Sequence, residues 1–178
     1  MEECKIELKD CKTFTDLKNH AEKTAEILVH ELKKHSLTLA LSESCTAGLV
    51  SSFIAGVPGA SAVLWGSFVC YTLEAKASML DIDMAFISTH GAVSRETAFS
   101  MALGALQKSG SNLAAAVTGL AGPDGDGSNV PVGTVWIAAA QKGGALKVNE
   151  HHFTDCREAV RIRSAVAVLE TILSILPG

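Results

Sequence analysis

The sequence has few aromatic residues, little charge and no long apolar segment. Aromatic residues make up 5% of its 178 positions and charged residues 19%, whereas Ala and Gly are plentiful. This composition favours helices packed closely on a sheet over an aromatic-rich β sandwich. No segment is long and apolar enough to span a membrane, and the first residues do not form a secretion signal. We therefore expect no membrane partner and a cytoplasmic location.

Positive charge and paired cysteines are also scarce. The formal net charge is −4, from 15 basic and 19 acidic residues, and no basic cluster stands out. This excludes double-stranded nucleic acid as the main partner. The five cysteines are odd in number and none lies in a C-x-x-C motif. They indicate neither a disulfide framework nor a zinc site, and so favour a reduced protein.

Hydrophobic periodicity and turn residues divide the chain into alternating helices and strands. They predict helices over 16–34 (with Thr15 as N-cap), 46–55, 74–80, 95–109 (with Ser94 as N-cap) and 157–176, strands over 37–41, 62–71, 113–117, 132–140 and 145–153, and a loop over 119–131. This alternation predicts one α/β domain whose sheet is covered by helices on both faces. We assign residues 15–178 to that domain and 1–14 to an N-terminal extension.

The most informative stretch runs from Ser42 to Gly48, directly after an apolar strand and before an apolar helix. Such a strand–turn–helix directs free backbone N–H groups and a helix dipole toward a site. A serine placed there, Ser44, suits attack on a carbonyl, and its loop equally suits binding of a phosphate. Ser44 needs a base, for which Lys76, Glu43 and the histidines are candidates. The simpler alternative is that Ser44 and Thr46 only cap the next helix.

Tyr71 and Lys76 form a second candidate cluster after the predicted strand 62–71. Tyr71 is the single tyrosine of the chain, and a turn would bring it and Lys76 to one site. A lysine with a pKa lowered by burial can act as a base. The alternatives are a solvated lysine and a tyrosine that packs in the core.

Two further stretches suit anion binding. Successive backbone N–H groups of Thr118 to Pro123 can cradle an anion, although no Walker-type P-loop is present, and the length of the loop hints at a lid. Asp124 and Asp126 in that loop are candidates for metal binding or are simply solvated. In the last helix Arg157 and Arg161 share one face and Arg163 points elsewhere. Guanidinium groups suit phosphate or carboxylate, but surface arginines are the default.

The joint order of several blocks is more specific than any single block. These blocks are E-S-C-T-A-G at 43–48, V-P-G-A-S at 57–61, Y-T-L-E-A-K at 71–76, H-G-A-V-S at 90–94, V-T-G-L-A-G-P at 117–123, P-V-G-T-V at 131–135 and R-E-A-V-R-I-R at 157–163. Over roughly residues 20 to 176 the chain resembles the C-terminal domain family of the competence/damage-inducible protein CinA. The resemblance implies a three-layer α/β/α domain with a mixed sheet. It also implies the activity of the stand-alone members, which resemble nicotinamide-nucleotide amidases that hydrolyse nicotinamide mononucleotide (NMN) to nicotinate mononucleotide and ammonia.

The resemblance also implies roles for individual residues. Ser44 would be the nucleophile, Lys76 its general base and Tyr71 the group that orients the pair. The remaining candidates would bind the nucleotide, donate backbone N–H groups to the oxyanion or contact a partner subunit: Glu43, Cys45, Thr46, Gly48, Thr118, Gly119, Arg161 and Arg163. The chemistry needs neither a cofactor nor a metal. A homodimer or higher homo-oligomer is expected.

The chain departs from the family pattern at three places. Ala47 and Leu73 stand where a glycine and an asparagine are usual, and the loop G-P-D-G-D-G-S-N-V-P-V-G replaces a more uniformly glycine-rich one. Two other functions stay open. One is a non-enzymatic nucleotide-binding or interaction module linked to competence or the DNA-damage response, and the other is an amidase for a different amide.

Overall fold

The computed structural model describes residues 13–177, which form a mixed five-stranded sheet with helices on both faces. The strands are β1 (Leu39–Glu43), β2 (Leu64–Val69), β3 (Leu113–Gly119), β4 (Thr134–Gln141) and β5 (Leu146–His152). The α-helices are α1 (Phe14–Lys34), α2 (Leu49–Ala55), α3 (Leu73–Leu80), α4 (Met84–His90), α5 (Arg95–Ser109) and α6 (Arg157–Leu173), and a 3-10 turn spans Ala60–Ala62. The predicted extension, apart from its last two residues, lies outside the described residues.

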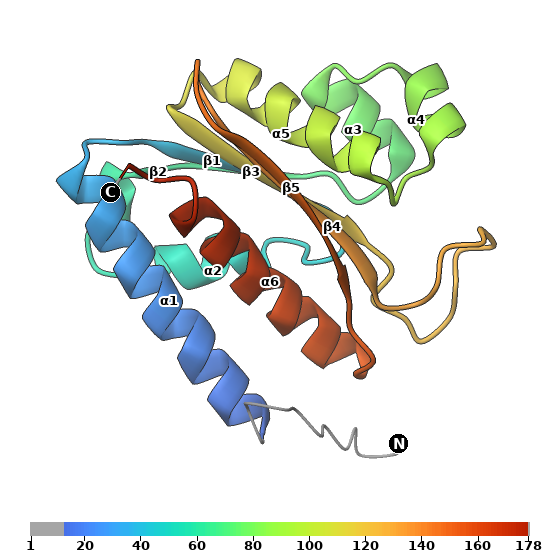
Figure 1. Ribbon diagram of the computed structural model, residues 1–178, viewed down its shortest axis with the longest axis horizontal. Coiled ribbons are helices and arrows are strands. Elements are labelled where there is room, and N and C mark those ends of the chain that lie inside the picture. The colour runs from blue at the N-terminus through green and yellow to red at the C-terminus, as the bar shows by residue number, and fades with distance from the viewer. Residues whose placement is uncertain (1–12, 178) are drawn as a thin grey trace.

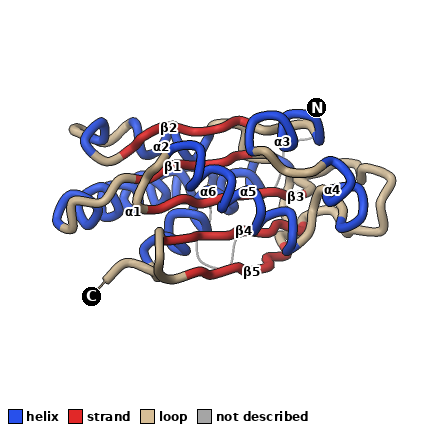
Figure 2. The backbone as a smooth tube through the Cα atoms, turned by 90° about the horizontal axis from the view of Figure 1, so that it is seen from above, coloured by secondary structure: helices blue, strands red, loops and turns tan. Residues whose placement is uncertain are grey.

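The strand order is β2-β1-β3-β4-β5, as Figure 2 shows from above the sheet. Strand β1 pairs in parallel with both β2 and β3, whereas β4 and β5 add antiparallel to β3. The carboxyl ends of β1, β2 and β3 therefore meet at one edge of the sheet. In α/β sheets this is the edge at which ligands bind.

Helices α1, α2 and α6 cover one face of the sheet, and α3, α4 and α5 cover the other (Figure 1). Strand β3 is buried on both faces, because Leu113, Ala115 and Val117 pack in the α1–α6 core while Ala114 and Ala116 pack against α5. Alanine at these positions lets the helix backbone approach the sheet closely. The predicted α/β/α architecture and mixed sheet are confirmed.

Helix α1 begins earlier than the sequence predicted. Thr13, not Thr15, is its N-cap, and the Thr13 and Asp16 side chains form a reciprocal capping box with each other's backbone N–H groups. The apolar stripe of Leu17, Ala21 and Leu28 faces the core as expected. Because Thr13 and Thr15 are both good caps, only the position of the acidic partner distinguishes them.

Helix α4 was missed by the sequence analysis. Asp83 caps it by accepting from the Ala85 N–H at 2.9 Å, and Ile87 is its buried residue. A seven-residue helix with one buried side chain has almost no periodicity to detect. The last helix is also shorter than predicted, because α6 ends at Leu173 and not at residue 176.

The cysteines differ from the prediction at one position. Cys45 and Cys70 are free and buried, as a reduced protein requires, but Cys156 is disulfide-bonded, so the expectation of reduced cysteines is wrong there. Within residues 13–177 no group of acidic, histidine and cysteine side chains is arranged to hold a metal ion. In the same part of the chain, no helix has the length and apolar character needed to cross a membrane.

Candidate active site

Ser44 lies in the tight turn that joins β1 to α2. Its N–H donates to the Val117 carbonyl at 3.0 Å, which fixes it to the end of β3, and the Ala47 N–H donates back to the Ser44 carbonyl at 3.0 Å. The turn is completed in the left-handed region, with φ of 50° at Ala47 and 91° at Gly48. An alanine tolerates this conformation less well than a glycine does. Ser44 itself is 6% exposed.

Lys76 reaches Ser44 from the first turn of α3. The Lys76 Nζ lies 2.9 Å from the Ser44 Oγ, and it also donates to the main-chain carbonyls of Cys70 at 3.2 Å and Tyr71 at 3.5 Å. Thr72 places the lysine, because its hydroxyl accepts from the Ala75 N–H and caps α3. At 2% exposure the lysine is the largest fully buried side chain of the described residues.

Burial governs the protonation of Lys76. Removal from water disfavours the ammonium and lowers the Lys76 pKa, which the nearby Cys70 and Cys45 side chains only partly oppose. Within residues 13–177 no carboxylate forms an ion pair with it. The neutral amine has two N–H groups for the Cys70 and Tyr71 carbonyls, and its lone pair is then free to accept the Ser44 O–H. This is the arrangement of a hydroxyl nucleophile beside a base.

Glu43, the residue before Ser44, points away from the pocket. Its carboxylate is 1% exposed and accepts from the Val50 and Ser51 N–H groups at 3.0 and 2.9 Å. It also accepts from the Thr46 and Ser67 hydroxyls at 2.9 and 3.0 Å. Glu43 therefore anchors α2 to the end of β1 and supports the turn that carries Ser44.

Ser44 and Lys76 lie in a cavity of about 370 Å³ at the carboxyl edge of the sheet. The cavity is lined by Ser44, Cys45, Tyr71, Thr72, Leu73, Glu74, Lys76, Ala92, Val93, Thr118, Gly119, Leu120, Ala121, Gly122, Asp124, Asp126 and Arg157. Its volume suits a small organic ligand. Segments from β1, β2, β3, α3 and α6 thus converge on one site, as the topology requires.

Six of the predicted site residues share this cavity: Ser44, Cys45, Tyr71, Lys76, Thr118 and Gly119. The Thr118 hydroxyl donates to the Ala92 carbonyl at 2.7 Å and holds the 90–94 segment against the site. Gly119 has no room for a side chain, because an added Cβ would lie 2.8 Å from the Thr134 carbonyl oxygen. Its main chain is consequently the only part that can face a ligand.

The other predicted binding residues do not line the cavity. Arg161 donates to the carbonyls of Cys45 at 3.1 Å and Thr46 at 2.8 Å, so it supports the turn that carries Ser44. Arg163 pairs with Asp155 at 2.8 Å. Thr46 and Gly48 belong to the turn, and Thr46 donates to Glu43. These residues position the site and do not contact the cavity.

Arg157 is the arginine of α6 that lines the cavity. Its guanidinium donates to the Gly122 carbonyl at 2.6 Å and to the Tyr71 hydroxyl at 2.9 Å. Sequence analysis placed it on the face of Arg161 and preferred Arg161 and Arg163 for binding. The signal that distinguishes it is its position as the first residue of α6, beside the end of the sheet.

Two backbone N–H groups, of Cys45 and Thr46, follow Ser44 directly in the turn. No backbone carbonyl within residues 13–177 accepts from the Cys45 or Thr46 N–H, and the Cys45 N–H interacts with its own thiol. The Cys45 thiol is not a competing nucleophile, because burial raises its pKa to about 12. The site therefore combines a buried hydroxyl and a buried amine within hydrogen-bond distance of each other.

The family model of the CinA C-terminal domain matches residues 21–176. The chain belongs to this family. It is 43% identical over 138 residues to a CinA-like protein of Geobacter metallireducens, covering 78% of the chain but 33% of that relative. The chain thus spans about a third of the length of such curated relatives.

A shorter relative and two solved structures match nearly end to end. The chain is 39% identical over 142 residues to the nicotinamide-nucleotide amidohydrolase PncC of Enterobacter agglomerans, covering 80% of the chain and 87% of that protein. The structure of CihA from Agrobacterium tumefaciens has a TM-score of 0.85 at 36% identity, covering 88% of the chain and 95% of CihA. A CinA-superfamily structure from Escherichia coli has a TM-score of 0.85 at 29% identity, covering 96% and 95%.

Proposed function

We propose that the protein is an amidohydrolase that converts NMN to nicotinate mononucleotide and ammonia by a Ser-Lys mechanism. The observation that carries this proposal is the 2.9 Å contact between the Lys76 Nζ and the Ser44 Oγ at the base of the cavity. The amidohydrolase name of the PncC relative supports the reaction class. The choice of NMN as the substrate is the more specific part of the proposal.

The reaction proceeds in two halves. Lys76 accepts the Ser44 proton as Oγ forms a bond with the carboxamide carbon, and the resulting ammonium then protonates the departing nitrogen, which leaves as ammonia. A water molecule, deprotonated by the neutral Lys76, next attacks the ester carbon. The C–Oγ bond breaks, Lys76 returns the proton to the Ser44 Oγ, and the carboxylic acid that forms gives its own proton to water and leaves as the carboxylate. Burial lowers the Lys76 pKa, and this lowering suits both directions of proton transfer.

The backbone N–H of Cys45, which lines the cavity beside Ser44, is the proposed donor to the oxyanion in this mechanism. Removing one such donor in other enzymes costs about 3–4 kcal/mol of transition-state stabilisation. Arg161 contributes indirectly, because it donates to the Cys45 and Thr46 carbonyls and so holds the turn that carries Ser44. Arg161 is accordingly a positioning residue and not a substrate ligand.

Tyr71 and Arg157 bind the substrate in this proposal. The Tyr71 ring is 52% exposed beside Lys76, so its face is available to a pyridinium ring. Arg157 already orients the Tyr71 hydroxyl, and its guanidinium is the only cationic group of the cavity rim among the described residues. It is the group best placed to attract the nucleotide phosphate.

The assembly and location of the protein belong to the same proposal. We propose a homo-oligomer in the cytoplasm. The edge strand β2 supports a partner copy, because it carries no charged residue and leaves Trp65 and Val69 52% and 43% exposed. Size-exclusion chromatography with light scattering measures the molar mass of the protein in solution and so tests the assembly. The mass of a monomer at micromolar concentration would contradict it.

Ammonia release tests the function. Purified protein is incubated with NMN and with a panel of other primary amides, beside Ser44→Ala as the matched control. Release of ammonia from NMN by the wild type and not by Ser44→Ala supports the proposal. Release only from another amide contradicts NMN as the substrate and identifies that amide instead. If NMN raises the melting temperature but is never consumed, the protein is a nucleotide-binding module and not an amidohydrolase.

A further inference from the structure

Two leucines, Leu73 and Leu120, line the active-site cavity without packing in the core. Neither belongs to the three hydrophobic clusters that the described residues form. Leu73 is 37% exposed, and the nearby Tyr71 of the same cavity is 52% exposed. Ligand sites are lined mainly by apolar and aromatic side chains that converge on a concave surface. The cavity therefore offers apolar surface to a ligand as well as the polar pair of Ser44 and Lys76.

The strand order places the two leucines on opposite sides of Ser44. Strand β1 lies between β2 and β3 and pairs in parallel with both, so the chain leaves all three strands at the same edge of the sheet. Ser44 follows β1 directly, Leu73 begins α3 after β2, and Leu120 follows β3 directly. A group bonded to a carboxamide carbon at the Ser44 Oγ therefore extends into a cavity with Leu73 on its β2 side and Leu120 on its β3 side.

Helix α3 holds Leu73 beside the reacting atoms. Leu73 is the first residue of the helix, and Lys76 lies three positions later on the same helix face. The first turn is fixed by Thr72, whose hydroxyl accepts from the Ala75 N–H and whose carbonyl accepts from the Lys76 N–H at 3.1 Å. Because the Lys76 Nζ contacts the Ser44 Oγ, a substrate that reaches Ser44 passes Leu73.

The main chain of Leu120 is fixed by the start of β4. Its N–H donates to the Thr134 carbonyl at 2.9 Å, and its carbonyl accepts from the Gly133 N–H at 2.7 Å. These two hydrogen bonds hold the residue in place without help from its side chain. A planar ring suits a space with a leucine on either side, because each face of the ring can pack against apolar atoms.

We propose that Leu73 and Leu120 are specificity-determining residues that hold a planar ring bonded to the carboxamide, so that the site selects ring carboxamides such as that of NMN over small aliphatic amides. This inference rests on the proposed hydrolysis of an amide at Ser44 and names the class of amide. It leaves the phosphate end of the substrate with Arg157. Leu73 is also one of the positions at which the chain departs from the family pattern, so an apolar contact there distinguishes this chain.

The size of the effect follows from the apolar contact that is lost. Replacing either leucine by alanine removes the branched end of the side chain, and losing its contact with one face of a ring weakens binding about five- to tenfold. Alanine is a strong helix former, so Leu73→Ala keeps α3 intact. Leu73→Met retains an apolar side chain of similar volume and should restore the contact.

Calorimetry measures the dissociation constants of NMN and of ribose 5-phosphate, which has the sugar and the phosphate but no ring. The parent protein is Ser44→Ala, in which the proposed nucleophile is absent, and the leucine substitutions are added to it one at a time. Ammonia release by the wild type from NMN and from propionamide gives kcat/KM for a ring carboxamide and for an aliphatic amide. Circular dichroism verifies the fold of each variant.

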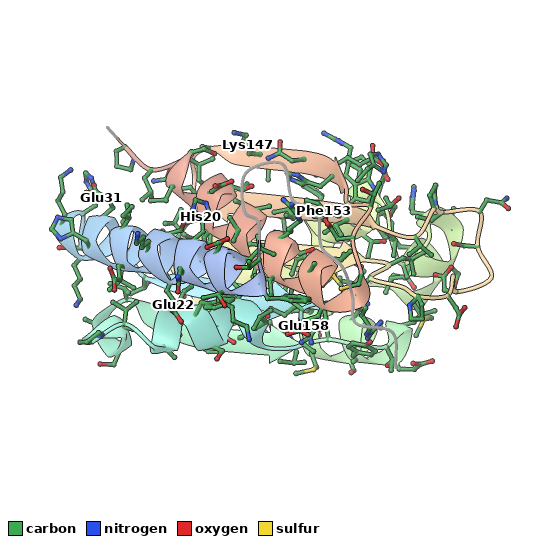
Figure 3. The ribbon with its side chains drawn as sticks, turned by 90° about the horizontal axis from the view of Figure 1, so that it is seen from below. His20, Glu22, Glu31, Lys147, Phe153 and Glu158 are labelled. Atoms are coloured by element: carbon green, nitrogen blue, oxygen red, sulfur yellow. The ribbon has the colours of Figure 1, made fainter. Side chains whose placement is uncertain are left out.

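The matched control is Met79→Ala. Met79 is an apolar residue of the same helix and is 40% exposed, but it is not among the described residues that line the cavity. A second control, Glu22→Gln, alters an exposed carboxylate on α1, a helix that contributes none of the described cavity residues (Figure 3).

The inference predicts that Leu73→Ala and Leu120→Ala each weaken NMN about five- to tenfold and leave ribose 5-phosphate unchanged. Leu73→Met and both controls should bind the two ligands as the parent does. Equal weakening of both ligands, or an NMN dissociation constant that neither alanine variant changes, overturns the inference.

The two proposals can fail separately. If the wild type releases no ammonia from either amide but NMN binding changes as stated, the proposed hydrolysis fails and the recognition of the ring stands. If the wild type hydrolyses NMN and propionamide with the same kcat/KM, the hydrolysis stands and the inference is overturned.

Discussion

Replacing Glu43 by glutamine tests whether this residue supports the site or binds the substrate. Its two carboxylate oxygens accept four hydrogen bonds, two from backbone N–H groups and two from hydroxyls. A glutamine keeps one accepting oxygen, and its NH2 group cannot accept. The hydroxyls of Thr46 and Ser67 can rotate to accept from that NH2 group. In either orientation of the amide, however, one backbone N–H, of Val50 or of Ser51, loses its acceptor.

The loss can be estimated from these contacts. An unsatisfied buried N–H costs about 1–3 kcal/mol, and the remaining bonds lose the extra strength that a charged acceptor provides. We expect Glu43→Gln to lower the free energy of unfolding by about 2–4 kcal/mol, a fall in melting temperature of roughly 6–12 °C for a domain of this size. The KM of the folded protein should change little, because Glu43 does not line the cavity.

Urea unfolding followed by circular dichroism measures the effect, with Glu22→Gln as the matched control. The midpoint should fall in Glu43→Gln with an unchanged slope, and it should not move in the control. The reasoning is refuted if Glu43→Gln unfolds at the wild-type midpoint while its KM rises several-fold. That result would make Glu43 a substrate ligand, as the sequence alone suggested.

Three further predictions follow from the site. Burial lowers the Lys76 pKa below 10.5, so between the folded-state pKa and 10.5 the unfolded chain binds more protons and stability rises with pH. Lys76→Met should remove this rise, measured by urea unfolding at several pH values, and an identical slope in both proteins would contradict the pKa argument. Ala47→Gly should stabilise the protein by about 0.5–1 kcal/mol, because φ at Ala47 is 50°; a lower unfolding midpoint would exclude strain there. Arg157→Met should raise the KM for NMN about tenfold with the fold intact, and a KM equal to that of the wild type would remove Arg157 from the substrate site.

The sequence predicts the architecture well where the hydrophobic pattern is strong. Leu39 to Leu41 and Leu113 to Val117 form uninterrupted apolar runs, and both are buried central strands. The stripe of α1 predicts its buried face correctly, but two threonines separated by one residue, Thr13 and Thr15, make its first residue ambiguous. Helix α4 has too few buried side chains to produce a pattern. Strand order depends on contacts between distant segments, which local periodicity does not contain.

The candidate site, like the fold, is predicted from the sequence only in part. Ser44 and Lys76 are suggested by residue type and by their positions after strands, and the structure brings the two side chains into contact. The sequence does not indicate which polar residues near the Ser44 turn face the cavity and which face the protein interior behind the turn. Glu43 and Arg161 were therefore expected at the ligand but bind the protein itself. Arg157 was not predicted as a site residue, because its place in the cavity depends on where the start of α6 meets the sheet.

The central claim is that Ser44 and Lys76 act together on the carboxamide. A double-mutant comparison of ammonia release from NMN, using Ser44→Ala, Lys76→Met and the two combined, tests it most directly, with folding of each variant verified by circular dichroism. The account predicts that each single substitution removes nearly all activity and that the double variant is no worse than either, since the two groups serve one step. Activity retained by Lys76→Met, or losses that multiply in the double variant, would contradict it.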